Sequence, residues 1–287
     1  MKIGIIGGSG FYALDHLKSP EELLVDTPFG PPSDAVVIGS FGNHEVFFIP
    51  RHGKGHRIMP SRINHCANVF ALKSLGVECA ISISSVGSLK EDRVPGDMVL
   101  PDQYFDRTKQ NHTFYQDIAT HVPFGEPTCK ALRKHLGKIA HEQAVIVGRQ
   151  AFDYGTYVNM EGPVFSTKAE SHFYRSLDAS VVGMTSLPEA KLFRESEICY
   201  SAIAMVTDFD CWHEEEGSVT ADAVVQQAKK NVKLATNTII AFLKSLDQLS
   251  PCDSGCKDAL AGAIMTHSDH ISDDIRTKLD PLIGHRI

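Results

Sequence analysis

The chain has 287 residues and an ordinary globular composition. Its 28 Lys and Arg stand against 35 Asp and Glu, a net charge of −7, which excludes a basic nucleic-acid-binding surface as the default prediction. Hydrophobic residues make up 43% and charged residues 22%, which excludes a largely disordered protein. No apolar run approaches the roughly 20 residues that cross a bilayer, and glycines interrupt the apolar N-terminus, unlike a signal peptide. We therefore expect a cytoplasmic protein with no membrane or nucleic-acid partner.

The first part of the chain alternates predicted strands with one predicted helix. In chain order these are a strand over 2–6, a hairpin of 35–38 and 45–49, a helix over 61–75, and a strand over 79–84. Gly42 and Asn43 are typical of a hairpin turn, and Gly76 is placed to end the helix. The stretch from Ser19 to Glu22 indicates a helix start or a loop.

After a less regular middle, the second part repeats this alternation. The predicted elements are helices beginning at residues 167 and 186, strands over 180–184 and 198–206, and a long helix over about 218–246. Thr167 and Ser186 each stand three residues before a Glu, the pattern of a capping box. The strand over 198–206 is apolar on both faces and belongs at the centre of a covered sheet. The chain therefore predicts an α/β fold with one domain over 1–250 and a C-terminal extension over 251–287 packed on it.

A glycine-rich loop, Gly7 to Phe11, follows the first predicted strand. Its backbone N–H groups and the Ser9 hydroxyl can surround an anion. The loop also fits a dinucleotide fingerprint, which requires an acidic residue at the end of a second strand about 20 residues on. Glu21 and Glu22 stand instead in the stretch that indicates a loop or helix start. A tight turn without a ligand remains open.

Two further segments are suited to holding an anion. Arg51 and His52 open a glycine-broken loop with five basic or imidazole groups, and the Arg fork matches phosphate oxygens. The hydroxyls of Ser84 and Ser85 gather at the carboxyl end of a buried strand, where open α/β sheets bind ligands. A solvated basic loop and buried hydroxyls satisfied by the backbone are the alternatives.

Asp208 and Asp210 follow the most apolar predicted strand, with one residue between them. In extended backbone, residues two apart point to the same side, so both carboxylates can address one edge of a ligand. Partial desolvation would raise the pKa of such a carboxyl group, which suits proton transfer near neutral pH. The alternative is a pair of loop acids that cap a nearby helix.

The seven cysteines are widely scattered, and we predict reduced core thiols for most of them. Cys252 and Cys256 are the exception, since their spacing suits a local disulfide or half of a metal site. No second Cys/His pair with zinc-finger spacing accompanies them. We therefore predict no metal site.

These motifs in this order, together with residues 159–166 and 183–189, resemble the trimeric purine nucleoside phosphorylase family, and within it the branch acting on methylthioadenosine. The resemblance runs from Lys2 to about Leu246. It implies a central mixed, largely parallel sheet with flanking helices, and a homotrimer. It also implies phosphorolysis of a purine nucleoside, with inorganic phosphate as co-substrate and no metal or organic cofactor.

The resemblance assigns roles to individual residues. Phosphate binding falls on Ser9, Arg51, His52, Ser84, Ser85 and Thr185. Ribose binding falls on Met184, and the purine pocket falls on Phe165, Ser166, Asp208 and Asp210. His121 matches a residue that family members lend to the sugar pocket of the neighbouring subunit. Val224 is a candidate neighbour of an alkylthio group, or else a core residue of the long helix.

This chain departs from its relatives at two positions and cannot be aligned at its end. Ser9 and Ser84 stand where relatives often have Thr, and both keep the hydroxyl. The region after Ser250 does not align, which leaves its contribution to the alkylthio pocket unassigned.

Asp208 is the predicted catalytic residue, because the leaving purine needs its developing charge quenched at N7. A carboxylate at Asp208 or Asp210 would accept a hydrogen bond from the exocyclic amino group of adenine, whereas a 6-oxo purine presents an acceptor. Relatives that prefer 6-oxo purines carry Asn at the Asp208 position. We therefore expect reversible phosphorolysis of S-methyl-5′-thioadenosine to adenine and 5-methylthioribose 1-phosphate. Methylthioinosine or general purine nucleosides as substrates, and a non-catalytic phosphate-binding module, are the alternatives.

Overall fold

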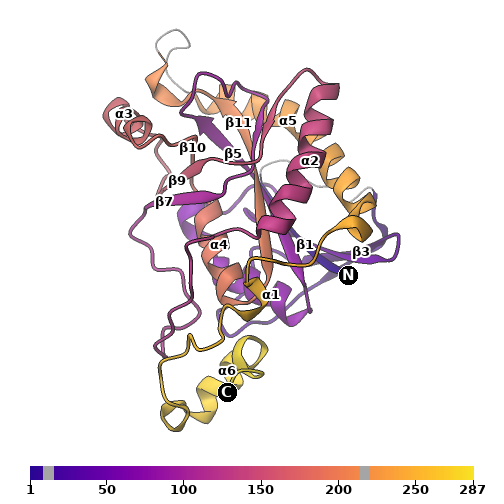
Figure 1. The fold of residues 1–287 in the computed structure, drawn as a ribbon, viewed down its shortest axis with the longest axis vertical. Coiled ribbons are helices and arrows are strands. Elements are labelled where there is room, and N and C mark those ends of the chain that lie inside the picture. Colours follow the sequence, from indigo (N-terminus) through magenta and orange to yellow (C-terminus); the bar gives the residue numbers. More distant parts are fainter. Residues whose placement is uncertain (9–15, 214–219) are drawn as a thin grey trace.

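A computed structural model describes residues 1–8, 16–213 and 220–287. Within these residues eleven strands form one sheet with the core order β2-β3-β4-β1-β5-β10-β9-β7 (Figure 1). β11 pairs with β5 and β6, and β6 pairs with β8. The strands are β1 Lys2–Gly7, β2 Lys18–Leu23, β3 Val36–Phe41, β4 His44–Pro50, β5 Cys79–Ser88, β6 Met98–Val99, β7 Gln103–Arg107, β8 Ala151–Phe152, β9 Thr156–Met160, β10 Val181–Gly183 and β11 Cys199–Asp208. Both parallel and antiparallel pairs occur, with β1, β4, β5 and β11 parallel, so the predicted mixed sheet is confirmed.

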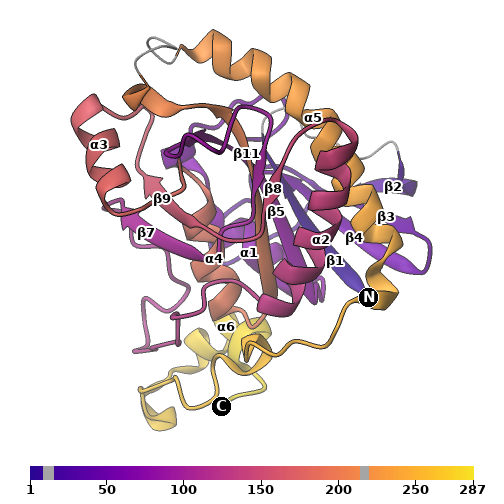
Figure 2. The same cartoon turned by 45° about the horizontal axis from the view of Figure 1, so that its top comes forward.

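Helices cover both faces of this sheet (Figure 2). The α-helices are α1 His65–Ser74, α2 Lys130–Ile146, α3 Lys168–Ser176, α4 Ser186–Glu195, α5 Ala221–Lys244 and α6 Asp273–Ile283. Leu136 of α2 and Phe242 of α5 belong to the apolar cluster on one face. Phe70 of α1 and Phe193 of α4 belong to the cluster on the other. The predicted α/β class is therefore confirmed.

β11 lies at the centre of the molecule, as its sequence predicted. Every residue from Cys199 to Thr207 is buried. Ile203 packs in the cluster of α2 and α5, and Tyr200 packs in the cluster of α1 and α4. Side chains alternate along a strand, so a strand that is apolar on both faces needs a helix layer on each side.

Residues 18–23 are a strand, β2, and not the predicted loop or helix start. β2 pairs antiparallel with β3, and the register shifts between Lys18 and Glu21. All six residues are exposed, so no burial period marks the strand in the sequence. A proline such as Pro20 is tolerated there because an edge strand does not need every N–H for pairing.

The first predicted helix begins later than its apolar pattern suggested. Residues Pro60–Arg62 form a separate 3₁₀ turn, and α1 starts at His65. The Asn64 side chain accepts a hydrogen bond from the backbone N–H of Ala67, and this cap sets the start.

The two predicted capping boxes have different outcomes. Thr167 and Glu170 form the full reciprocal box at the start of α3. α4 also begins at Ser186 as predicted, but its N-cap residue, Thr185, makes no side-chain capping bond. The Glu189 carboxylate instead forms an ion pair with Arg51.

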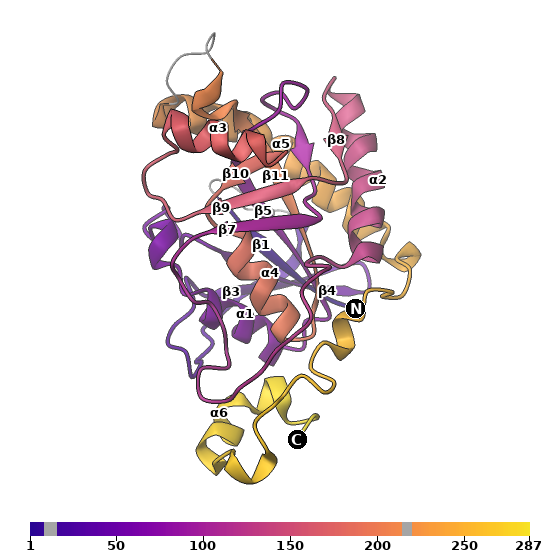
Figure 3. The same ribbon diagram turned by 60° about the vertical axis from the view of Figure 1, so that its left-hand side comes forward.

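The C-terminal extension packs on the same body and ends in α6. Leu279, Leu282 and Ile283 of α6 are buried in the cluster of α1 and α4. Glu197, beside the start of β11, accepts hydrogen bonds from Arg286 Nη2 at 2.7 Å and from the Leu260 backbone at 2.9 Å. α6 lies at the opposite end of the molecule from α3 (Figure 3). No helix among the described residues is long and apolar enough to cross a membrane.

All seven cysteines are free thiols, as predicted for most of them. The local disulfide considered for Cys252 and Cys256 is therefore not formed.

Candidate active site

A cavity of about 390 Å³ opens where β5, β10 and β11 end, beside the glycines that close β1 and the loop after β4. Its walls include most of the site residues predicted from the sequence: Arg51, His52, Ser84, Ser85, Phe165, Met184, Thr185, Asp208, Asp210 and Val224. These residues are scattered along the chain, and the fold brings them to one place.

Two described site residues predicted from the sequence, Ser166 and His121, do not line this cavity. Ser9 lies outside the described residues. Ser166 is half-buried, and its side chain acts on the Asp210 carboxylate. His121 is exposed, and its backbone N–H donates to the Ala263 carbonyl at 2.9 Å.

Arg51 is fully buried and is held by a carboxylate. Its Nε atom donates to Glu189 Oε1 at 2.5 Å, and its Nη2 atom donates to Oε2 at 2.9 Å. Nη1 donates to the Ile83 carbonyl at 2.9 Å. Burial alone would lower the pKa of Arg51, but the charge and hydrogen bonds of Glu189 raise it above the ordinary value. This two-point pairing fixes the plane of a permanently charged guanidinium.

The Arg51 pairing still leaves donors for a ligand. A guanidinium carries five N–H groups, and only some of them are used by Glu189 and Ile83 among the described residues. Nη1 is 3.3 Å from the place where a Cβ atom would stand at Gly8, and that Cβ would lie 2.9 Å from the Ile83 carbonyl. Glycine at residue 8 therefore lets the backbone and Arg51 approach the same point.

A buried hydroxyl network supports Glu189 from behind. Tyr200 Oη is 3.4 Å from Glu189 Oε2, 3.1 Å from Ser186 Oγ and 2.6 Å from Ser82 Oγ. Tyr104 Oη is 2.8 Å from Ser186 Oγ. Burial raises the pKa of Tyr200 well above its ordinary value, so this hydroxyl stays neutral. The network orients the carboxylate that in turn orients Arg51.

His52 is a neutral imidazole at pH 7. Burial first, and the charge of Arg51 second, lower its pKa to about 4. Its Nδ1 is 2.8 Å from the Ile58 carbonyl, which can only accept, so Nδ1 carries the proton. Nε2 is then an acceptor, suited to the O–H of monoprotonated phosphate. The His56 ring stacks on His52 with centroids 4.1 Å apart and also lines the cavity.

Hydroxyl groups complete the anion-binding side of the cavity. The Ser84 Oγ atom is buried and makes no hydrogen bond within the described residues, so it is available to a ligand. Ser85 is exposed on the cavity wall. Thr185 precedes the ten-residue helix α4 without capping it, so its hydroxyl stands at a helix N-terminus, where anions are favoured.

The two carboxylates meet over a glycine on the opposite side. Asp208 Oδ2 is 2.7 Å from Thr207 Oγ1, and Oδ1 accepts from the Asp210 backbone N–H at 2.8 Å. A Cβ at Gly87 would lie 2.9 Å from Asp208 Oδ1 and 3.2 Å from Asp210 Cβ. Both carboxylates therefore face the cavity, and the absence of a side chain at Gly87 leaves room for them.

The backbone geometry differs from the extended one that the sequence argument used. β11 ends at Asp208, and Asp210 has a φ of +53° at the start of a 3₁₀ turn. Aspartate is one of the few non-glycine residues that enter this left-handed region readily. Both carboxylates line one cavity, but the turn after β11 brings them there, and not strand alternation.

Asp210 is the more desolvated of the two. Burial raises its pKa above the ordinary value, although Ser166 and Ser171 partly oppose the shift. Its Oδ2 atom is buried and makes no hydrogen bond of normal geometry within the described residues, although the Ser171 and Ser166 hydroxyls act on the carboxylate. An orphaned acceptor on a cavity wall calls for a donor on the ligand.

Apolar side chains line the cavity between the two polar ends. They are Met59, Pro60, Val86, Met160, Pro163, Phe165, Val182, Met184 and Val224. Val224 is half-buried on the first turn of α5, so it is a wall residue and not only a core residue. No described residue after Val224 lines the cavity, so the C-terminal extension of the same chain does not contribute to it.

Several known proteins that are similar to this chain over nearly its whole length are named for the same enzyme activity. The family model of the phosphorylase superfamily matches residues 2–244. A protein of Chloroflexus aurantiacus named S-methyl-5′-thioadenosine phosphorylase is 47% identical, with 98% of this chain and 97% of that one covered. The chain belongs to the S-methyl-5′-thioadenosine phosphorylase family. A Geobacter sulfurreducens protein of the same name is 44% identical, with 98% of each chain covered.

Solved structures of this phosphorylase family agree with the fold. A methylthioadenosine phosphorylase from an Antarctic soil metagenomic library superposes with a TM-score of 0.90 at 41% identity, covering 98% of both chains. The Schistosoma mansoni methylthioadenosine phosphorylase in complex with adenine superposes with a TM-score of 0.86 at 35% identity, covering 92% of this chain and 99% of that one. The family and the fold predicted from the sequence are therefore confirmed.

Several residues of the site were missed by sequence reasoning. The capping-box pattern assigns Glu189 to a helix cap. Its position shortly after Thr185, in a motif that the chain shares with the family, was a signal that it belongs to the site. His56 was seen only as one cation of a loop. Thr207 and Gly87 carried no signal, because their importance comes from the approach of Asp208, which only the tertiary structure shows.

Proposed function

We propose that the cavity performs the reversible phosphorolysis of S-methyl-5′-thioadenosine to adenine and 5-methylthioribose 1-phosphate. The observation that carries the proposal is one cavity with an anion site at one end, built on Arg51, and two carboxylates at the other. The names of the relatives support the same activity. This function was also the one expected from the sequence.

Phosphate binds at the end formed by Arg51, His52 and the hydroxyls of Ser84, Ser85 and Thr185, with Ser9 from the glycine loop. Arg51 carries a fixed positive charge, and α4 presents its N-terminus. His52 Nε2 accepts a hydrogen bond from the phosphate O–H, which turns the charged oxygens toward Arg51. A phosphate oxygen attacks the anomeric carbon, and the bond between that carbon and N9 breaks through an oxocarbenium-like state.

The leaving adenine gains electron density that must be neutralised at N7. Asp208 supplies a proton or a hydrogen bond there, and its position is fixed by Thr207 and by the Asp210 backbone. General acid catalysis of this kind contributes roughly 10²–10⁴-fold. The net proton comes from monoprotonated phosphate: the phosphate oxygen bonds to the anomeric carbon, the bond from that carbon to N9 breaks, the phosphate proton is given up, and adenine leaves with one proton on its imidazole ring.

The unpaired oxygen of Asp210 selects adenine over 6-oxo purines. Oδ2 is buried and needs a donor, which the exocyclic amino group provides. A 6-oxo group would place two acceptors against each other. A site built on one hydrogen bond can reject the analogue without it by roughly 10⁴-fold at best.

Phe165 and Ser166 complete the purine side, Met184 contacts the ribose, and Val224 receives the 5′-alkylthio group. We further propose that the enzyme works in the cytoplasm as a homotrimer, with His121 closing the sugar pocket of a neighbouring subunit. The exposure of His121, away from its own cavity, suits that role. The reaction uses phosphate as co-substrate, without a metal or organic cofactor in the chemistry.

The test is purine release from methylthioadenosine, methylthioinosine, adenosine and inosine, each with and without phosphate. We expect methylthioadenosine to be preferred by orders of magnitude, with release strictly dependent on phosphate. A preference for methylthioinosine or inosine would overturn the role of Asp210. Release without phosphate would overturn the anion site.

A further inference from the structure

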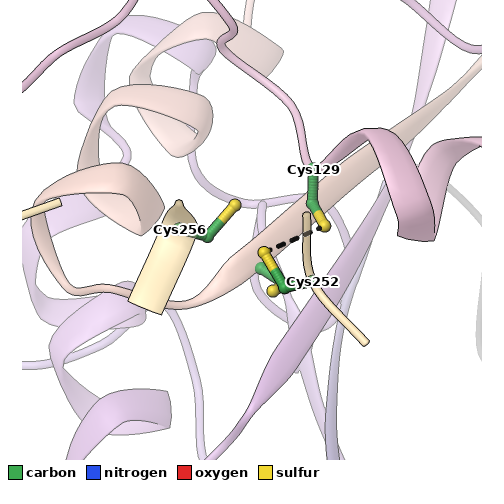
Figure 4. A group of neighbouring side chains, drawn as sticks. Cys129, Cys252 and Cys256 are labelled. Atoms are coloured by element: carbon green, nitrogen blue, oxygen red, sulfur yellow. Dashed lines mark hydrogen bonds between the residues drawn. The ribbon is translucent and has the colours of Figure 1, made fainter. Parts of the chain in front are cut away.

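Four sulfur atoms from three separate segments meet at one point away from the cavity. Their Sγ atoms all lie within 4.8 Å of one another. We call this group the cysteine cluster: Cys129, Cys199, Cys252 and Cys256. Figure 4 shows three of them, with Cys129 preceding α2 and the other two in the C-terminal extension.

We propose that the cysteine cluster binds one structural Zn²⁺ ion through four thiolates. Zn²⁺ in structural sites is tetrahedral with Zn–S bonds of about 2.3 Å, which places the sulfurs about 3.8 Å apart. The Sγ atoms of Cys129 and Cys252 are 3.8 Å apart. The remaining pairs lie within 4.8 Å, so small side-chain rotations bring all of them to tetrahedral distances.

The segments that carry the cluster are held in place by their backbones. The Cys129 N–H donates to the Tyr200 carbonyl at 2.8 Å, which fixes the start of α2 beside the start of β11. The Lys130 N–H donates to Ser254 Oγ at 2.8 Å. Arg194 Nη1 donates to the Ser254 carbonyl at 3.2 Å, so the turn between Cys252 and Cys256 is tied to the body from two sides. The ligands are thus positioned before an ion arrives.

The spacing and conformation of that turn are those of a metal-binding loop. Cys252 and Cys256 are separated by three residues, within the range common for zinc ligands. Gly255 has a φ of +61° and turns the chain just before Cys256. No second Cys/His pair with zinc-finger spacing accompanies these two cysteines in the sequence. Cys129 and Cys199 supply it, although they are far apart in sequence and so match no zinc-finger spacing.

The surroundings suit a negatively charged metal–thiolate group. Cys129 is the N-cap residue of α2, where the helix dipole favours negative charge. The buried Arg194 guanidinium acts electrostatically on Cys256. Cys129, Cys199 and Cys256 are buried, and a cavity of about 230 Å³ lined partly by Cys252, Leu249 and Lys257 gives an ion access. Simple packing of thiols in a core gives no reason for four sulfurs to converge.

The ion would act on stability and not on the reaction. Cys199 and Asp208 stand at opposite ends of the ten-residue strand β11, so roughly 30 Å of strand separates the cluster from the carboxylates. The ion would join the C-terminal extension to α2 and β11. This proposal does not rest on the proposed substrate, because no cluster residue lines the active-site cavity.

The first test measures the metal itself. The reduced full-length protein is purified without chelators, incubated with Zn²⁺, desalted and analysed for zinc. We expect about one zinc per chain, and all seven thiols reactive after denaturation with a chelator. Replacement by Co²⁺ should give the thiolate-to-cobalt charge transfer and visible bands of a tetrahedral sulfur site. Less than about 0.1 zinc per chain, missing cobalt bands, or thiols lost to disulfides would each overturn the proposal.

The second test locates the site with a double variant. Cys252→Ser with Cys256→Ser should lose the zinc and the cobalt bands, whereas Cys66→Ser, at a half-buried thiol outside the cluster, should keep both. Zinc should raise the Tm of the wild type and of Cys66→Ser by roughly 5–10 °C, but not that of the double variant. Turnover by the double variant should stay within about twofold at a temperature where it is folded. Retention of zinc by the double variant would overturn the assignment, whatever its stability.

Discussion

At its carboxyl end β11 delivers Asp208 to an open cavity, whereas at its amino end it delivers Cys199 to a cluster of thiols. The strand between is uniformly buried. At the open end, Asp210 Oδ2 and Ser84 Oγ are buried polar atoms without protein partners among the described residues. At the amino end, the Sγ atoms of the cysteine cluster lie within 4.8 Å of one another. Unsatisfied acceptors and hydroxyls mark a site for a polar substrate, and converging soft ligands mark a site for an ion.

The largest expected effect at the open end comes from breaking the pair of Arg51 and Glu189. Arg51→Met keeps the volume but leaves a carboxylate buried without its partner. We expect kcat/KM for phosphate to fall by roughly 10³-fold and the free energy of unfolding to fall by about 3–5 kcal/mol. Steady-state kinetics with varied phosphate and urea unfolding measure the two effects.

Glu189→Gln is the matched variant, because it keeps the shape and an acceptor for Arg51 but removes the charge. It should lose less activity and less stability than Arg51→Met. If Arg51→Met left phosphate kinetics unchanged, Arg51 would be a structural cation and the anion site would lie elsewhere.

The next effect concerns the division of roles between the two carboxylates. Asp208→Asn removes the group assigned to N7, so kcat for methylthioadenosine should fall by roughly 10²–10³-fold. Asp210→Asn gives the orphaned position a donor, so it should lower the preference for adenine over 6-oxo purines with a smaller loss of kcat. The ratio of kcat/KM for methylthioadenosine and methylthioinosine separates the two variants. Equal ratios in both would show that neither carboxylate selects the base alone.

The sequence predicted the sheet, its central strand and most of the cavity wall, because these depend on local patterns. The near-continuous apolar run located β11, and the hydroxyls and charges at strand ends located Ser84 and Arg51. The family resemblance supplied Phe165, Met184 and Thr185. Sequence reasoning failed where two residues in contact come from distant segments of the chain, or where a strand has no buried side chains. β2 is exposed along its whole length, Glu189 pairs with a side chain 138 residues away, and the cysteine cluster joins three segments that are 53 or more residues apart.

A smaller effect is expected from filling the space under the carboxylates. Gly87→Ala places a Cβ about 2.9 Å from Asp208 Oδ1, so the carboxylate must move. We expect kcat to fall by roughly 10–100-fold, with KM for phosphate little changed, because displacement of a catalytic group by about 1 Å is costly. Gly125→Ala is the control, since nothing lies within 4 Å of its Cβ position. A fully active Gly87→Ala enzyme would mean that the contact between Asp208 and Gly87 does not set the geometry of catalysis.

The smallest expected effect is a dependence of stability on pH at the phosphate end. Burial and Arg51 lower the pKa of His52 from 6.5 to about 4, so between these values the unfolded chain binds more protons than the folded one. Stability therefore rises with pH through this window, and is lost as pH falls. From His52 alone, the free energy of unfolding should be about 1 kcal/mol lower at pH 5.5 than at pH 7.5. Urea unfolding of the wild type and His52→Gln in phosphate-free buffer measures this, because the buried His65 is present in both proteins and burial, which does not change between them, is the largest cause of its lowered pKa. The pH dependence should be shallower in His52→Gln by that amount; equal slopes would mean that folding does not lower the pKa of His52, and the assignment of a permanently neutral, accepting Nε2 at the phosphate site would be wrong.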